Sequence, residues 1–306
     1  MDENGHVKAV GAGSAVITAT ANGNTDLTAT CSVTVTAINK TLYGIVWDEE
    51  GGEYFSSFNA STYDSNGALA WTKQHSDAKS LSLQSAFMKS TSTLYAATLD
   101  TGTAETEVYT VNRSSYALTD YAPNYLWASA MAIGVSGSSY TSYAGMVYSI
   151  QSYLAAGNID STTYSGTAYT GLPYALTDMS GTIGDAWIAG VACKTRGTSS
   201  GTYYFLDENG IIWQTDLSYG QYTEDGETYT GFYFGTPTKV VETDIATSFL
   251  YQSLYYDGTY LYWSHCDGSV AELIIINPST GAIYNAGNFG EGVWPVAGLY
   301  VNGSVA

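Results

Sequence analysis

The sequence predicts an all-β protein, and three observations point to this class. Charged residues make up only 12% of the 306 residues, whereas Tyr (28) and Gly (33) are abundant, as in strands joined by tight turns. Four short runs of aromatic and β-branched residues follow one another over 251–287, separated by turn sequences. Units of this kind recur about every 50 residues, which is the signature of a β-propeller.

The unit is clearest where its four predicted strands are separated by Asp, Asn, Gly and Pro. The runs are YQSLYY (251–256), TYLYWSHC (259–266), SVAELIII (269–276) and AIYNAG (282–287). Four strands with turn-length links predict an antiparallel meander. One meander cannot bury both of its faces, so it needs neighbours of the same kind.

Two features of this unit recur along the chain and predict five blades. The run predicted as a second strand is found at 41–48, 93–100, 143–150, 185–192 and 259–266. The Asn- or Asp-initiated turn predicted between third and fourth strands is found at 64–67, 112–115, 158–161, 207–210 and 277–281. The count becomes six if the segment Ser218–Gly235, predicted as an inserted hairpin, forms a blade of its own.

The two ends of this region predict ring closure. The region begins with a second strand at 41–48 and finishes with WPVAGLYV (294–301), which has the pattern of a first strand. Joining them completes one blade from both ends and removes open sheet edges. A series of β-sandwiches is the competing architecture, but it does not explain this shift of phase at the ends.

A separate module is predicted at residues 1–38. Strand runs are expected at His6–Val10, Ala15–Ala21 and Leu27–Ala37, and the boundary at Asn39–Lys40. This stretch resembles the C-terminal half of a bacterial Ig-like domain of group 2. The matching residues are Asp2, Gly5, Val7, Ala9, Val10, Gly13, AVITATA (15–21) and CSVTVTA (31–37).

The resemblance implies a partial Ig-like domain at 1–38, followed by a propeller at 41–306. It also implies further Ig-like modules upstream, and a bacterial protein that is secreted or displayed on the cell surface. A half-sandwich leaves an apolar face and open edges. We therefore expect it to dock on the rest of the chain, to pair with another chain, or to be poorly ordered.

Composition excludes several classes of partner. The net charge is −19 with nine Lys plus Arg, which argues against nucleic acid and anionic membrane surfaces. The sequence contains no run of 18 apolar residues, so membrane insertion is not predicted. Cys31, Cys193 and Cys266 are far apart and form no metal-binding motif, and no nucleotide or cofactor signature is present. We therefore expect no metal and no cofactor.

The predicted ligand face consists of loops in which aromatic residues neighbour carboxylates. Trp and Tyr rings can stack on sugars while polar side chains bond the hydroxyls. The alternative is that the Trp residues fill the space between blades. The predicted ligand-binding residues are Trp47, Asp48, His75, Asp77, Trp127, Arg196, His265, Asp267 and Trp294.

Two His–Asp pairs with i, i+2 spacing, His75 with Asp77 and His265 with Asp267, could supply a general base and its orienting group. Both pairs lie beside turns, where Asp is expected for backbone reasons, so no catalytic residue is predicted. The leading hypothesis is a non-catalytic head for adhesion or for carbohydrate or protein recognition. The alternatives are a polysaccharide-degrading hydrolase or lyase on a propeller, and a passive structural or assembly module.

Overall fold

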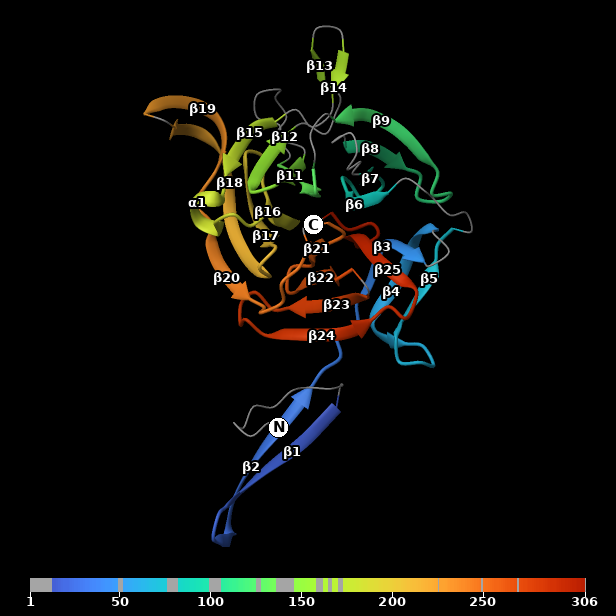
Figure 1. The fold of residues 1–306 in the computed structure, drawn as a ribbon, viewed down its shortest axis with the longest axis vertical. Helices are drawn as coiled ribbons and strands as arrows, with labels where there is room; N and C mark the ends of the chain where they lie inside the picture. The colour runs from blue at the N-terminus through green and yellow to red at the C-terminus, as the bar shows by residue number, and fades with distance from the viewer. Residues whose placement is uncertain are drawn as a thin grey trace. The chain divides into compact units, whose positions relative to one another are not determined.

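A computed structural model describes most of the chain (Figure 1). The chain divides into two units, Met1–Lys40 and Thr41–Ala306. The described residues are 13–48, 52–75, 82–98, 106–124, 128–135, 146–157, 162–164, 167–169, 173–224, 226–248, 250–268 and 270–305.

The first unit is a two-stranded antiparallel hairpin. It consists of β1 (Gly13–Ala21) and β2 (Asn24–Val35), and Gly23 in the turn has a φ of 88°, which glycine adopts readily. None of its described side chains is buried; Val16 is 66% exposed and Leu27 is 61% exposed. The predicted strand at His6–Val10 lies outside the described residues.

In the second unit, the described residues form five sheets of four or five antiparallel strands. The sheet that contains both ends of the unit consists of β25 (Val293–Tyr300), β3 (Thr41–Asp48), β4 (Glu53–Tyr63) and β5 (Leu69–Lys73). The next sheet consists of β6 (Leu83–Met88), β7 (Leu94–Thr98), β8 (Thr106–Val111) and β9 (Leu118–Asn124). The third consists of β10 (Ala130–Ile133), β11 (Met146–Ile150), β12 (Tyr153–Gly157) and β15 (Pro173–Asp178).

The last two sheets include the longest strand. The fourth sheet consists of β16 (Ile188–Arg196), β17 (Ser200–Asp207), β18 (Ile211–Glu224), β19 (Glu227–Phe234) and β20 (Thr238–Glu242). The fifth consists of β21 (Ser253–Tyr256), β22 (Leu261–Cys266), β23 (Ala271–Ile276) and β24 (Ile283–Asn288). A small hairpin, β13 (Thr162–Tyr164) with β14 (Thr167–Tyr169), and one helical turn, α1 (Ser180–Ile183), complete the described elements.

The five sheets are arranged around a common centre, as in a propeller (Figure 1). The first strand of each sheet contacts the first strands of the two neighbouring sheets, in the cyclic order β25, β6, β10, β16, β21 and back to β25. Closure is achieved by β25, which pairs with β3 across the two ends of the unit; Val296 faces Val46 and Ala297 faces Ile45. The predicted joining of the two ends is confirmed.

The core lies between the sheets and is rich in aromatic side chains. Trp263, Tyr148 and Tyr203 are fully buried. These aromatic residues of the strands therefore serve packing. Buried hydroxyls also tie neighbouring sheets together. Ser129 donates to the carbonyl of Ile188 at 3.0 Å, and Ser253 accepts the N–H of Leu299 at 2.7 Å.

One predicted strand assignment is wrong. The run 185–192 was expected as a second strand, but β16, which begins at Ile188, is the first strand of its sheet and β17 is the second. Second strands therefore begin at residues 41, 94, 146, 200 and 261, in steps of 53, 52, 54 and 61 residues. Both strands are largely buried, so composition cannot distinguish them. The turn at 207–210 accordingly joins second and third strands, and the turn at 158–161 lies outside the described residues.

The predicted insertion at Ser218–Gly235 is a hairpin and adds no sheet to the described part of the chain. The first half of β18 pairs with β20, and its second half pairs with β19. Within the described residues, no helix is long and apolar enough to cross a membrane.

Candidate functional site

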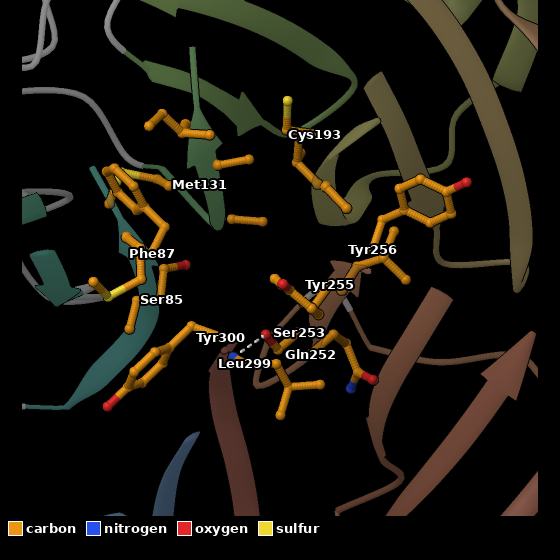
Figure 2. Close-up of a pocket in the computed structure, with 18 of the residues that line it drawn as sticks. Ser85, Phe87, Met131, Cys193, Gln252, Ser253, Tyr255, Tyr256, Leu299 and Tyr300 are labelled. Atoms are coloured by element: carbon orange, nitrogen blue, oxygen red, sulfur yellow. Dashed lines mark hydrogen bonds between the residues drawn. The ribbon is translucent and has the colours of Figure 1, made fainter. Parts of the chain in front are cut away.

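A narrow cavity lies at the centre of the ring (Figure 2). Each of the five first strands contributes side chains to it, for example Ser85, Met131, Cys193, Ser253 and Leu299. None of its described lining residues is charged. About 30 Å³ is open to the centre of a water molecule, so the cavity has room for water but not for a substrate.

The titratable groups of this cavity stay protonated at neutral pH. Burial raises the pKa of the Cys193 thiol to about 12 and also raises the pKa of Tyr255 and of Tyr300. A thiolate nucleophile therefore does not form there. The described lining of this cavity therefore holds no charged group at neutral pH.

A second hollow, here called the outer groove, lies on the fourth sheet. Its volume of about 520 Å³ is typical of sites for small ligands. It is formed where the end of β16, the start of β17 and the middle of β18 lie side by side. Its lining residues are Thr195, Arg196, Gly197, Ser200, Gly201, Thr202, Asp216, Leu217 and Ser218.

The register of β17 and β18 places polar side chains together in the outer groove. Thr202 pairs with Asp216 and Ser200 with Ser218, so these four side chains share one face of the sheet. Leu217 lies between them in sequence, points to the other face and is fully buried. The Thr202 hydroxyl donates a 2.6 Å hydrogen bond to Asp216 Oδ1, which orients an exposed carboxylate.

Arg196 also lines this groove, but it pairs with Gly201, which pairs with Leu217, so its side chain leaves the sheet on the face opposite Asp216. Its Nε–H donates to the carbonyl of Gly134 at 2.6 Å, which anchors the guanidinium. Among the described residues the salt bridges are Lys73–Asp48, Lys239–Glu242 and His265–Glu272, and none involves Arg196. The remaining N–H groups can therefore bind an anionic group of a ligand.

A glycine makes this local geometry possible. A Cβ at Gly201 would lie 2.9 Å from the Thr195 carbonyl oxygen, closer than such atoms approach. The β16–β17 hairpin can fold so tightly only with glycine at this position. A bulge in β16 between Cys193 and Thr195 also shifts the register there.

Of the predicted ligand-binding residues whose side chains the structure describes, Arg196 alone lines the outer groove. Trp47 is half-buried, its ring meets that of Tyr251 edge-on at 5.8 Å, and its Nε1 is buried without a hydrogen-bond partner. Asp48 accepts the N–H of Gly52 at 3.1 Å and forms a 3.2 Å salt bridge with Lys73. These contacts stabilise the strand end.

The other predicted residues are spread over other sheets. His75 follows β5, with its ring 6.3 Å from that of Tyr116. Asp267 accepts the N–H of Val270 at 3.2 Å in a turn. Asp77 and Trp127 lie outside the described residues, and Trp294 lies in β25 with its side chain outside the described part.

His265 is almost fully buried at 7% exposure, and both of its ring nitrogens are buried. Burial lowers the pKa of its imidazole, against the opposing effect of Glu272, whose Oε2 lies 3.9 Å from Nδ1. A hydrogen bond with the Ala246 backbone also favours the charged imidazole. Of the two carboxylates near His265, Glu272 lies on β23 and Asp267 lies in the turn before it, and neither lines the outer groove. Within the described residues, no cluster of three metal-binding side chains is found.

Sequence reasoning missed Asp216, Thr202 and the two serines. They alternate with buried residues in QTDLS (214–218) and SGTYYF (200–205), which is the ordinary pattern of a strand with one solvated face. Only the pairing register of β17 and β18 marks these residues, because it places the Thr202 hydroxyl opposite the Asp216 carboxylate.

Comparisons with known proteins add little. No protein-family model and no curated protein matches the sequence. Among solved structures, the chain is similar to a crystal structure described as "a putative 6-phosphogluconolactonase" from Bacteroides fragilis. The identity is 10% and the TM-score is 0.35; the match covers 87% of this chain and 99% of the other.

The predicted non-catalytic head for adhesion or recognition is corrected here. The described loop residues that were predicted as a recognition face lie on different sheets, and Asp48 and Asp267 accept hydrogen bonds from the backbone of their own turns.

Proposed function

We propose that the Thr41–Ala306 unit is a five-bladed β-propeller enzyme, one blade for each of the five sheets, and that it is a lyase acting on an acidic carbohydrate in the outer groove. One observation carries the proposal: an oriented, exposed carboxylate and a guanidinium that has no salt bridge to the described residues both line the outer groove, from the two faces of its sheet. The hydroxyls of Ser200, Thr202 and Ser218 add donors and acceptors that suit the hydroxyls of a sugar.

The chemistry follows from these two charged groups. Arg196 pairs with the carboxylate of a uronate and stabilises the negative charge that develops when the neighbouring carbon loses its proton. Asp216 accepts that proton as general base. The electron pair forms a carbon–carbon double bond as the bond to the glycosidic oxygen on the next carbon breaks. That oxygen leaves with a proton from solvent.

The groove supports elimination better than glycoside hydrolysis. A glycosidase of the usual kind needs two carboxyl groups flanking the scissile bond. The described lining of the outer groove contains one carboxylate, Asp216, and one cation, Arg196. This set matches a reaction that needs one base and one group to neutralise an acid.

The test is an elimination assay on polygalacturonate, alginate and glycosaminoglycan. The expected product is an unsaturated uronate, seen as a rise in ultraviolet absorbance. The assay is run at about 0.15 M salt, so that the net charge of −19 is screened from the polyanion beyond about 8 Å. Asp216→Asn should lower kcat by at least about a hundredfold, because the base is lost while the shape is kept.

Asp185→Asn is the matched control, since Asp185 is exposed and lies outside the groove. It should retain wild-type turnover. Arg196→Gln should raise KM for these acidic polymers. The proposal is overturned if none of these polymers is cleaved, or if Asp216→Asn and Asp185→Asn have the same rate.

The location of the protein is a second part of the proposal. We propose that the β1–β2 hairpin belongs to a bacterial Ig-like module and that the enzyme works outside the cell, linked to further modules of that kind. The support is the sequence resemblance at residues 1–38. Fractionation of the producing bacterium with an antibody to the propeller tests this; recovery of the protein only from the cytosol would reject it.

A further inference from the structure

The hairpin of β18 and β19 has three tyrosines on one face. Tyr222 pairs directly with Tyr229, and Tyr233 pairs with Ser218, so the rings share the face that carries Asp216 and Ser218. The Tyr222 ring centre lies 5.6 Å from that of Tyr229 and 5.3 Å from that of Tyr233, and both interplanar angles are 30°. The three rings, here called the tyrosine platform, form one shallow aromatic surface.

The opposite face of the hairpin holds it to the propeller. Phe232 and Phe234 are buried in the core, and β19 contacts β15 of the neighbouring sheet. Tyr219 packs edge-on against Phe232 with ring centres 5.2 Å apart. The tyrosine platform is therefore on the solvent side; Tyr229 is 43% exposed.

Two glycines beneath the rings are not explained by the fold. Gly220 and Gly231 pair with each other in mid-strand, where glycine weakens a strand. Neither has a positive φ, and a Cβ at either would meet nothing closer than 3.8 Å. The nearest atoms are Cε1 of Tyr233 above Gly220 and Cε1 of Tyr222 above Gly231. A side chain longer than that of Ala at either position would press on the ring above it, so the glycines leave room for the three tilted rings.

We propose that the tyrosine platform binds the pyranose rings of an oligosaccharide whose next unit occupies the outer groove; this rests on the lyase activity proposed for that groove. Flat aromatic faces take up the C–H face of a sugar, and the adjoining hydroxyl, carboxylate and guanidinium groups take up its polar substituents. The substrate is accordingly a chain of several sugars, longer than one ring. The platform acts as a positioning surface and makes no bond in the reaction.

The test uses affinity electrophoresis in gels containing polygalacturonate, alginate or glycosaminoglycan. The wild-type protein should be retarded by the polymer that it cleaves. Tyr222→Ala should weaken binding about tenfold. Gly231→Val keeps every tyrosine and suits a strand, so it tests the arrangement of the rings alone; it should weaken binding without lowering the unfolding midpoint. Tyr219→Ala, on the opposite face, is the matched control and should bind as the wild type does.

The outcomes separate this inference from the lyase proposal. If turnover needs Asp216 but Tyr222→Ala and Gly231→Val have the wild-type KM for polymer, the platform inference is wrong and the lyase proposal stands. If the platform variants lose binding but Asp216→Asn still turns over, the lyase proposal fails alone. If no polymer retards the wild type, and sedimentation shows self-association that Tyr222→Ala abolishes, the platform is a contact between copies and the inference is overturned.

Discussion

At the scale of single residues, Gly201 shows how a local steric limit shapes the site. Gly201→Ala would place a Cβ 2.9 Å from a backbone oxygen, which has little freedom to move. We expect a loss of about 1–3 kcal/mol in the free energy of unfolding and a lower affinity in the outer groove. Urea unfolding measures the first effect. Gly181→Ala, which meets nothing within 4 Å, is the control and should be neutral or slightly stabilising.

His265 makes stability depend on pH in a definite direction. Burial lowers the pKa of its imidazole, so the folded state releases this proton at a pH where the unfolded state still binds it. Stability contributed by neutral His265 is therefore complete above about pH 6.5 and falls as the pH drops toward its folded pKa. His265→Gln should flatten this dependence. Urea unfolding midpoints of the wild type and of His265→Gln, taken at about pH 7.5 and about pH 5, measure this dependence. An equal change of midpoint with pH in the two proteins would contradict the prediction.

At the scale of elements, β18 serves two partners along its length. Its first half completes the sheet with β20, and its second half leaves the sheet to pair with β19. The point of division lies near Leu217 and Phe234, both buried. The part beyond Tyr219 and Phe232 bears two of the three platform rings, Tyr222 and Tyr229, and contributes little to the core.

Shortening this hairpin should separate stability from binding. Replacing Gly220–Gly231 by Asn-Gly leaves Tyr219 opposite Phe232 across a two-residue turn, the favoured hairpin connection. We expect cooperative unfolding with a midpoint near that of the wild type, and loss of polymer binding in affinity gels. Calorimetry and affinity gels measure these. A broad, non-cooperative transition would show that the tip is part of the core.

At the scale of the whole molecule, the ring depends on β25. This strand pairs with β3 and contacts both β6 and β21, so it joins the two ends of the unit and two neighbouring sheets. Removing residues 293–306 would expose the edge of β3 and the buried faces of its neighbours. We expect loss of cooperative thermal unfolding and binding of a hydrophobic dye. A truncated protein that unfolds cooperatively at the wild-type midpoint would contradict closure by this strand.

The sequence by itself determined the strands, most of their turns and the joining of the two ends. These features are local: turn residues and buried β-branched runs reveal themselves within a few positions, and the last run has the pattern of a first strand. The predicted runs 251–256 and 259–266 became β21 and β22 with their turn in place. The one misplaced strand, 185–192, shows the limit, because neighbouring buried strands have the same composition.

Only the tertiary structure decided where the candidate site lies. Thr202 and Asp216 belong to ordinary alternating strands, and nothing local marks them. Their pairing across β17 and β18 places them in the outer groove, which Arg196 lines from the other face of the sheet. Likewise, the tyrosines of the inserted hairpin become one surface only because the register places Tyr222 opposite Tyr229 above two glycines. Proximity across strands depends on register, and register is set by the packing of the whole sheet.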